Sequence, residues 1–207
     1  MDNNNNNNND HLLDAAYWKQ RYQNNDAIWD IGSASPAIAT FLNQLTQKEI
    51  SILIPGCGNS YEAELLIKND FKNVHLLDYA AEPLRNFAAK NPSFPEDHLH
   101  CEDFFHHNGT YDLIIEQTFF CALNPSLRKK YVEKMYSLLK PSGRLAGLLF
   151  NCEFEKEGPP FGGNENEYRL YFEPLFEIKM EPCYNSIPKR EGRELFIILQ
   201  KRVLSHE

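Results

Sequence analysis

The chain has 207 residues, of which 42% are hydrophobic and 13% aromatic, a composition typical of one globular domain. Its formal net charge of -8 disfavours a nucleic-acid partner, which needs clustered Lys and Arg, and favours a small-molecule partner. No apolar run approaches the roughly 20 residues needed to cross a bilayer, so we expect no membrane insertion.

The N-terminal segment carries no sign of secretion. Residues 1–10 contain the asparagine run 3–9, which cannot bury apolar surface and predicts a disordered tail before a domain over 11–207. No basic stretch followed by an apolar one occurs before Asp14, so we expect a cytoplasmic protein. The 5 cysteines are widely spaced and include no C-x-x-C pair, so we expect reduced thiols.

Two helices are predicted before the first strand. Apolar and aromatic residues recur at helical spacing over 12–22. A second helix begins at Ser35-Pro36, because serine is a favoured N-cap and proline is favoured at the first helical position. The loop between the two helices carries Trp29.

From Ile50 onward, short apolar runs alternate with helical stretches, a pattern typical of a parallel sheet with crossover helices. Strands are predicted at 51–54, 74–78, 99–102, 111–115 and 144–150. Helices are predicted at 61–68, 82–90 and 126–139, the last one ended by Lys140-Pro-Ser-Gly143. The strand-like segments 176–180 and 195–199 have no helical pattern between them and predict a terminal antiparallel hairpin. The predicted fold class is therefore α/β and doubly wound.

The turn Pro55-Gly-Cys-Gly58 joins the first predicted strand to the helix that follows. Glycines there let the backbone approach a ligand closely and adopt φ > 0. Asp78 lies 20 residues beyond Gly58, at the end of the next strand, where a carboxylate can accept hydrogen bonds from both hydroxyls of a ribose. An ordinary strand-to-helix turn is the alternative, and the position of Asp78 favours a nucleoside site over it.

Dinucleotide-binding proteins carry the pattern G-x-G-x-x-G, and its third glycine helps to tell which nucleoside ligand a site can bind. That position holds Tyr61, whose bulk obstructs the close helix packing that a pyrophosphate site needs. The phosphate-loop pattern G-x-x-x-x-G-K-[ST] is also absent from the sequence. S-adenosylmethionine carries no phosphate, so this turn favours it over nicotinamide, flavin and triphosphate nucleotides.

Two later strand ends add candidates for an adenosine site. Asp103 and Phe104 follow the third strand, where a carboxylate can bind the amine of adenine and a ring can cover its face. Glu116 and Gln117 end the fourth strand at the same edge of the sheet. The alternatives are that Phe104 belongs to the core and that Glu116 is a solvated strand end.

Segments with a shared family pattern are spread along the chain. They are Tyr17-Trp-Lys-Gln-Arg-Tyr22, Ile28-Trp-Asp30, Leu53-Ile-Pro-Gly-Cys-Gly58, Phe119-Phe-Cys-Ala-Leu-Asn-Pro125, Leu138-Leu-Lys-Pro-Ser-Gly-Arg144, Glu157-Gly-Pro-Pro-Phe161 and Ser186-Ile-Pro-Lys-Arg-Glu-Gly192. Together they resemble the thiopurine S-methyltransferase superfamily, most closely its thiol and halide methyltransferases. The resemblance covers nearly everything after Asp14. It implies a class I methyltransferase with a Rossmann-like, mostly parallel seven-stranded sheet, S-adenosylmethionine as cofactor, S-adenosylhomocysteine as product, and an N-terminal lid over 11–45.

The resemblance also implies which residues contact the cofactor. These contacts come from the lid (Trp18, Tyr22 and Trp29), the glycine turn (Gly56, Cys57 and Gly58), the ribose end (Asp78 and Tyr79), the adenine end (Asp103 and Phe104) and the strand end near the amino group (Glu116 and Gln117). Three positions depart from the plant-like members. Tyr22 stands where those members usually carry Trp, and Gln117 and Phe161 stand where they carry Tyr.

The expected reaction is methyl transfer to a small soft nucleophile, a thiol, a halide or thiocyanate, by in-line displacement in an aromatic chamber. Phe119, Phe120 and Phe161 are candidates for the acceptor wall, with core packing as the alternative. A thiol is already partly ionised at neutral pH, so no catalytic residue is assigned. The basic turn 189–193 is a candidate site for an anionic acceptor, with a solvated turn as the alternative.

The histidines give a weaker signal. No carboxylate or cysteine completes a familiar ligand spacing around His98, His100, His106 and His107, so no metal is predicted. They are interpreted as loop residues, with His106 or His107 a candidate base for a neutral thiol. The alternative function for the whole chain is a non-catalytic, cofactor-binding regulatory protein of the same fold.

Overall fold

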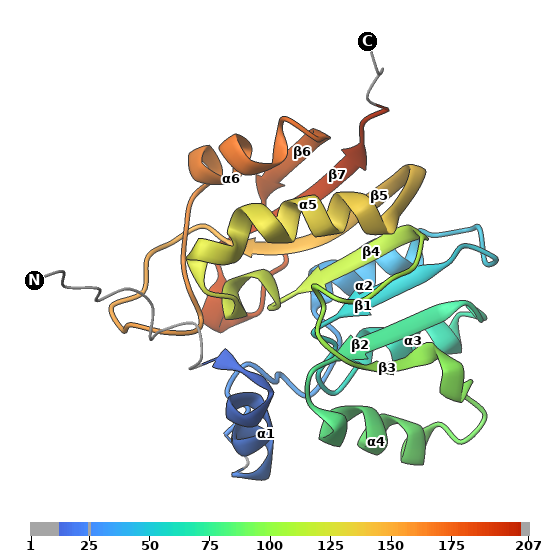
Figure 1. The fold of residues 1–207 in the computed structure, drawn as a ribbon. Helices are drawn as coiled ribbons and strands as arrows, with labels where there is room; N and C mark the ends of the chain where they lie inside the picture. Colours follow the sequence, from blue (N-terminus) through green and yellow to red (C-terminus); the bar gives the residue numbers. More distant parts are fainter. Residues whose placement is uncertain (1–12, 25, 204–207) are drawn as a thin grey trace, which may run out of the picture.

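The computed structural model describes residues 13–24 and 26–203, which form a seven-stranded sheet with helices on both faces (Figure 1). The strands are β1 Ile52–Pro55, β2 Val74–Asp78, β3 Leu99–Cys101, β4 Tyr111–Gln117, β5 Leu139–Phe150, β6 Phe176–Pro182 and β7 Glu194–Lys201. Their order across the sheet is β3-β2-β1-β4-β5-β7-β6. Strands β1 to β5 pair in parallel, and β7 is antiparallel to both β5 and β6. The predicted fold class, including the terminal antiparallel hairpin, is confirmed.

One prediction lies wholly outside this range and another partly. The asparagine-rich tail expected over 1–10, and position 12 at the start of the first predicted helix, lie outside the described residues. Within the described residues, no helix is both long enough and apolar enough to cross a membrane.

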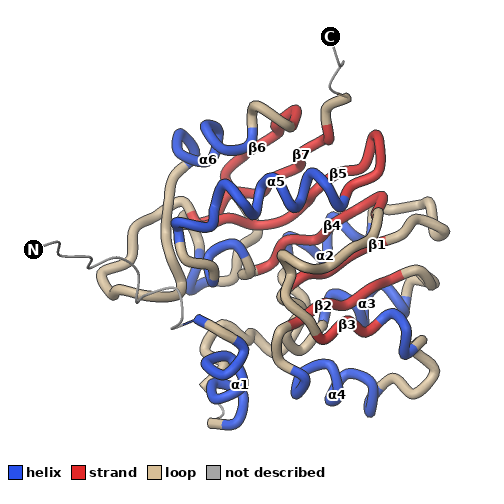
Figure 2. The backbone as a smooth tube through the Cα atoms, in the orientation of Figure 1, coloured by secondary structure: helices blue, strands red, loops and turns tan. Residues whose placement is uncertain are grey.

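Five of the helices divide between the two faces of the sheet, and the first one contributes no buried residue to either core. The helices are α1 Ala15–Gln23, α2 Pro36–Asn43, α3 Tyr61–Lys68, α4 Ala81–Lys90, α5 Arg128–Leu138 and α6 Glu165–Phe172. In Figure 1, α5 lies in front of the sheet and α2 and α3 lie behind it, and Figure 2 shows the same arrangement with helices in blue. Ile52 and Ile54 of β1 pack into the core shared with α2 to α4, whereas Leu53 packs into the core shared with α5 and α6. Because side chains alternate along a strand, burial on both faces explains the continuous apolar run.

The main difference from the sequence prediction is α6, which no predicted element covers. Its N-cap is Asn164, whose side chain accepts a hydrogen bond of 3.0 Å from the backbone N–H of Glu167. Asparagine followed three residues later by glutamate is a recognised helix start. Tyr168 and Phe172, one helical turn apart, are then both buried.

A second difference concerns the Lys140–Gly143 segment, which ends α5 as predicted but does not form a separate loop. Strand β5 begins at Leu139 instead of 144, and its pairing with β4 shifts register between Tyr111 and Leu113. Residues 125–127 form a short 3-10 helix before α5 begins at Arg128. The start of β5 depends on its pairing with β4, which the local sequence does not report.

The sheet order creates a crevice at one place. Strand β1 lies between β2 and β4, so the connections after β1 and β4 leave the sheet in opposite directions, and ligands of doubly wound folds bind at this switch point. Of the expected lid over 11–45, the structure places α1 and the following loop near this crevice. Helix α2 instead packs in the core through Ala37, Ile38, Phe41 and Leu42.

Candidate active site

The turn after β1 is shaped by left-handed backbone conformations. Gly56 and Gly58 have φ values of +58° and +51°, and Ser60 at the end of the turn has +60°. The N–H of Gly58 donates a hydrogen bond of 3.0 Å to Oδ2 of Asp78, and the N–H of Ala80 donates one of 2.8 Å to Oδ1. Burial raises the pKa of Asp78 to about 6, although these backbone donors favour its charged form. The turn therefore holds a carboxylate at the wall of the crevice.

The turn after β4 is held by a second buried carboxylate. Oε1 of Glu116 accepts the N–H groups of Phe119 and Phe120 at 2.8 and 2.9 Å, and Oε2 accepts the hydroxyl of Tyr131. Glu116 is 0% exposed, and this burial raises its pKa to about 7. Thr118 inside this turn has a φ of +58°, which is strained for a β-branched residue. Glu116 thus stabilises the strained turn that presents Thr118 and Phe119 to the crevice.

The two turns meet through Gly56 and Phe119. A Cβ added to Gly56 would lie 2.7 Å from Cγ of Phe119, closer than real Cβ contacts come. The ring of Phe119 also meets Phe104 edge to face, with ring centroids 5.0 Å apart. Only glycine allows this close approach of the ring to the backbone.

Helix α1 and the loop after it cover the crevice. Trp29 meets Trp18 and Tyr22 edge to face, with centroids 5.4 and 5.7 Å apart. Asp30 accepts hydrogen bonds from the side chains of Asn59 and Tyr61, at 3.1 Å for Tyr61, which ties this loop to the glycine turn. Burial, with a smaller effect of the Asp78 carboxylate, raises the pKa of Tyr22 well above its ordinary value, so its hydroxyl stays neutral.

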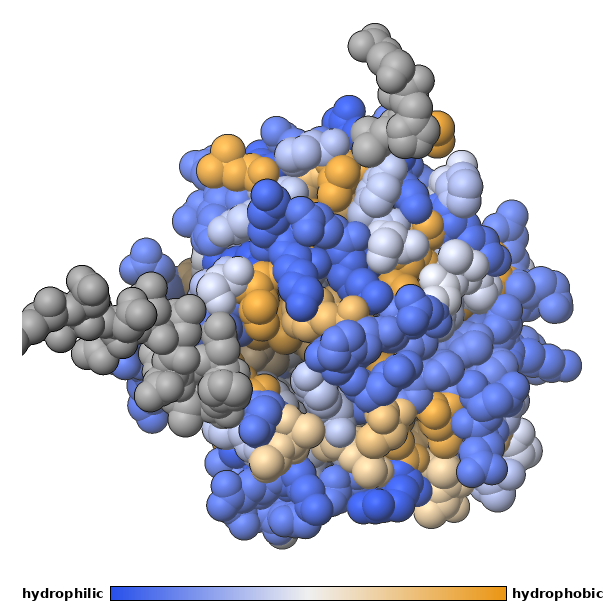
Figure 3. Space-filling view, viewed as in Figure 1, coloured by the Kyte–Doolittle hydropathy of each residue, from blue (hydrophilic) through white to orange (hydrophobic). Residues whose placement is uncertain are grey.

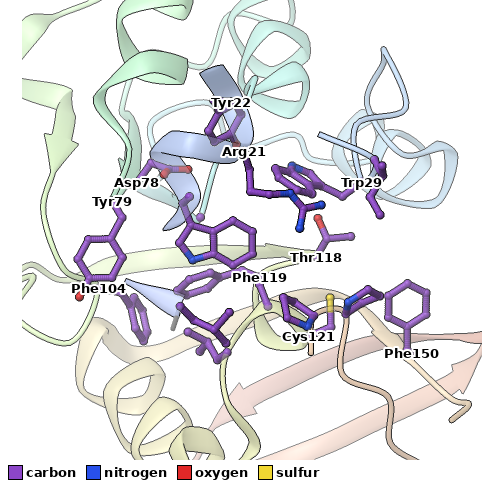
Figure 4. A pocket seen from close by; sticks show the side chains of 18 of the residues that line it. Arg21, Tyr22, Trp29, Asp78, Tyr79, Phe104, Thr118, Phe119, Cys121 and Phe150 are labelled. Atoms are coloured by element: carbon purple, nitrogen blue, oxygen red, sulfur yellow. The ribbon is translucent and has the colours of Figure 1, made fainter. Parts of the chain in front are cut away.

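Between these parts lies a cavity of about 270 Å³. Figure 4 shows Asp78, Tyr79 and Phe104 toward one end, Cys121 and Phe150 toward the other, and Phe119 and Thr118 between them. In the space-filling view of Figure 3, hydrophobic residues show in the hollowed part of a face that is otherwise mostly hydrophilic. A concave, largely apolar site with a few polar groups is typical of small-molecule binding.

The structure brings many of the sequence candidates together on this cavity. Those that line it are Trp18, Tyr22, Trp29, Gly56, Asp78, Tyr79, Phe104 and Phe119. Among the described residues, the other candidates lie behind or beside its wall, namely Cys57, Gly58, Asp103, Glu116, Gln117, Phe120 and Phe161. The candidate site residues therefore form two groups, those that line the cavity and can contact a ligand, and those that shape the wall.

The residues beside the wall have identifiable contacts. Phe120 is 1% exposed and packs edge to face on Tyr131 in the core. The N–H of Phe161 donates a hydrogen bond of 2.7 Å to the carbonyl of Cys121, a residue that lines the cavity. In the described part of the chain, Oε1 of Gln117 is buried and has no hydrogen-bond partner.

At the end of the cavity near Phe104, Glu102 contributes to the wall although the sequence analysis did not single it out. Its neighbour Asp103 turns back to accept the N–H of Phe105 at 2.8 Å. Burial and a hydrogen bond to Asp103 raise the pKa of Tyr79 well above its ordinary value. Glu102 directly follows β3, and a polar residue just after a strand at this edge of the sheet was the available signal.

The opposite end of the cavity carries aromatic and basic residues from distant segments. They include Phe150, Phe154, Pro159, Pro160, Lys189, Arg190 and Arg193, together with Thr118 and Cys121. Arg190 donates a hydrogen bond of 3.2 Å to the carbonyl of Trp29, which links the basic turn to the lid. The sequence singled out this turn as a charge cluster, whereas its position beside the cavity depends on pairing between β5 and β7.

The comparison with known families agrees with this geometry. The family described as Thiopurine S-methyltransferase (TPMT) matches residues 13–198, nearly the whole chain. The chain belongs to the thiopurine S-methyltransferase family. This membership confirms the predicted family and its class, an S-adenosylmethionine-dependent methyltransferase.

Individual relatives support the same assignment, and a solved structure shares the fold. Over 184 residues the chain is 30% identical to probable thiol methyltransferase 2 of Arabidopsis thaliana and 28% identical to thiocyanate methyltransferase 1 of Brassica oleracea. Each match covers 86% of this chain and 81% of the relative. The 1,6-didemethyltoxoflavin-N1-methyltransferase of Burkholderia thailandensis, solved with bound 1,6-didemethyltoxoflavin and S-adenosylhomocysteine, has a TM-score of 0.72 at 14% identity. That match covers 93% of this chain and 89% of the solved one, and it shows a shared fold.

Proposed function

We propose that this family member transfers a methyl group from S-adenosylmethionine to a small anionic nucleophile, a thiolate first, with halide or thiocyanate as further acceptors. One observation carries the proposal: a single cavity has a buried carboxylate and glycine turn at one end and aromatic and basic residues at the other. The names of the thiol and thiocyanate methyltransferases similar to this chain agree with that choice of acceptor.

The residues at the carboxylate end fit S-adenosylmethionine. Among the described residues, Asp78 accepts hydrogen bonds from backbone N–H groups and from no side chain, so no side chain competes with a ribose hydroxyl for its oxygens. Gln117 does not line the cavity, so its contribution would be to shape the strand end behind the wall. Gly56 lines the cavity and has no side chain, so its backbone could contact the amino-acid tail of the cofactor.

The remaining cofactor roles follow from position. Phe104 and Tyr79 would flank the adenine, and Asp103 would act through its bond with Tyr79. Cys57 and Gly58 would contribute backbone groups of the turn, and Glu116 would act by holding the turn that bears Phe119. Trp18, Tyr22 and Trp29 would cover the bound molecule from above.

The chemistry needs alignment and the exclusion of water more than proton transfer. The cofactor supplies an activated methyl group on a cationic sulfonium. Trp29, Phe119 and Phe150 present ring surfaces, which stabilise a nearby cation and exclude water. As the nucleophile's new bond to the methyl carbon forms, the bond from carbon to sulfonium sulfur breaks, and that bonding pair neutralises the sulfur.

The basic residues at the acceptor end favour an anion. Lys189, Arg190 and Arg193 line that end, and their positive charge would lower the free energy of a bound thiolate. Phe119 and, behind the wall, Phe161 and Phe120 would shape the acceptor space. An acceptor that is already ionised needs no general base. Both ring nitrogens of His107 are also engaged, one by Glu102 and the other by Tyr111.

The test is an acceptor screen that measures S-adenosylhomocysteine formation. The purified chain is incubated with S-adenosylmethionine and aromatic thiols, thiocyanate, iodide and thiopurines, and binding of S-adenosylhomocysteine is measured separately by calorimetry. Turnover with thiols or thiocyanate is expected. Binding of S-adenosylhomocysteine without turnover of any acceptor would favour a non-catalytic regulatory protein of the same fold.

Fractionation addresses the location of the enzyme. Cytoplasmic residence, expected from the sequence, stays a prediction, and recovery of the enzyme in the soluble cell fraction would support it.

A further inference from the structure

The edge of the sheet beside the cavity carries three potential metal ligands. One ring nitrogen each from His100 and His107 and a carboxylate oxygen from Glu102 lie within 4.8 Å of one another. His100 belongs to β3, the edge strand, and Glu102 follows two residues later, so both side chains project from the same face of the strand. His107 returns to that face because its N–H bonds to the carbonyl of Asp103 at 3.1 Å, closing a turn.

Further residues fix the two histidine rings. Nε2 of His107 lies 2.8 Å from the hydroxyl of Tyr111, and its Nδ1 lies 2.7 Å from Oε1 of Glu102. Nε2 of His100 lies 3.1 Å from Nδ1 of His75, whose Nε2 lies 3.0 Å from Oδ1 of Asn73. When each Nε2 carries the proton and donates to its neighbour, the Nδ1 lone pair of each ring is left for a cation. Metal-ligating histidines are usually held in this way.

The donor set indicates which cations the site suits. Two imidazoles and one carboxylate match Zn²⁺ and its first-row neighbours, which prefer nitrogen ligands, and not Ca²⁺ or Mg²⁺, which prefer oxygen. The side chain of Glu102 is 43% exposed, which leaves a path for entry and an open coordination position for water. Glu102 also lines the cofactor cavity, so the cluster borders the site without belonging to the methyl-transfer machinery described above.

We propose that His100, Glu102 and His107 form a binding site for a first-row divalent cation such as Zn²⁺ at the edge of the sheet. The sequence pattern H-x-E-x4-H is not a familiar ligand spacing, so the sequence alone predicts no metal here. The site arises from the strand alternation and the turn at residues 103–107. It does not depend on the identity of the methyl acceptor.

The test is metal titration of the full chain, purified with its affinity tag removed and pretreated with a chelator. Calorimetry with ZnCl₂ is expected to show one saturable site, and Co²⁺ is expected to give the visible absorption of a bound, low-symmetry ion. His100→Gln and Glu102→Gln are each expected to weaken Zn²⁺ binding by tenfold or more. Both retain polar side chains at partly exposed positions, and circular dichroism checks that they fold.

Two control variants separate this site from its surroundings. His106→Gln changes a histidine of the same turn whose side chain is 81% exposed, and Cys101→Ser removes the exposed thiol between the first two ligands. Both are expected to bind Zn²⁺ as the unmodified chain does. The proposal is overturned if no one-equivalent binding is seen, or if the ligand variants bind as tightly as the controls.

Discussion

The backbone N–H of Gly58 donates a hydrogen bond of 3.0 Å to Oδ2 of Asp78, joining the glycine turn after β1 to the carboxylate after β2. Asp78 is 8% exposed and lines the cavity, so the turn holds its carboxylate where the proposed ribose contact would form. The glycines and the acidic residue therefore act as one unit.

Replacing Asp78 by Asn is expected to weaken binding of S-adenosylhomocysteine by about 10- to 100-fold, because a hydrogen bond to a charged group contributes roughly 1.5–3 kcal/mol. The side-chain amide of Asn would also place its NH₂ group, a donor, against the backbone N–H of either Gly58 or Ala80, where Asp78 offers an acceptor. Calorimetry measures the affinity, and the thermal unfolding midpoint checks the fold. Unchanged affinity in a folded variant would refute the role of Asp78.

Cofactor affinity is expected to depend on pH through the same carboxylate. The pKa of Asp78 is raised to about 6, and only the charged form accepts hydrogen bonds from both ribose hydroxyls. The Kd for S-adenosylhomocysteine should therefore be constant above about pH 7 and rise toward tenfold per unit below about pH 6. The Asp78→Asn variant is the control, and its Kd should lack this dependence.

Gly56→Ala is expected to destabilise the protein by about 2 kcal/mol or more, because a side chain at φ +58° is strained and its Cβ would overlap Phe119. Denaturant unfolding measures the loss. Gly32→Ala is the matched control, since Gly32 also has a positive φ, of +75°, but has nothing within 4 Å of an added Cβ. In a Phe119→Ala background the Gly56→Ala cost should fall toward that of the control; an undiminished cost would exclude the ring as its cause.

Glu116 is expected to make stability decrease as pH rises. Its folded pKa of about 7 exceeds the ordinary 4.5, so its contribution is fully present below about pH 4.5 and is lost as pH rises toward 7, by about 3 kcal/mol in total. Glu116→Gln should fold and reduce this slope, because its carbonyl can accept the N–H groups of Phe119 and Phe120 while its amide donates to Tyr131. Unfolding free energies measured from pH 5 to pH 8 test this, and equal slopes for the two proteins would contradict it.

Arg193→Gln is expected to raise the KM for thiocyanate about 3- to 10-fold while leaving the Kd for S-adenosylhomocysteine unchanged, because Arg193 lines only the acceptor end. Its side chain is exposed, so the fold should tolerate the change. Steady-state kinetics with an anionic and an uncharged acceptor provide the comparison. An equal rise of KM for both acceptors would argue against a charge effect.

The sequence by itself determined the parts whose signals are local. Apolar runs between helical stretches predicted the parallel strands, and the glycine turn with Asp78 predicted the nucleoside end of the cavity. Helix α6 carried a local signal as well, Asn164 with Glu167, which the prediction did not use. These features depend on neighbouring residues and on strand periodicity, which can be read without the fold.

The tertiary structure alone decided how the wall is built. Glu116 accepts a hydrogen bond from Tyr131 of α5, and Phe119 packs on Gly56. Arg190 donates a hydrogen bond to the carbonyl of Trp29, which lies 161 residues away in the sequence. The three ligands of the proposed metal site likewise converge only through the turn after β3. Such contacts form between segments that are distant in the sequence and that packing brings together. A local sequence pattern therefore does not show which carboxylate, ring or charged side chain will contact which other.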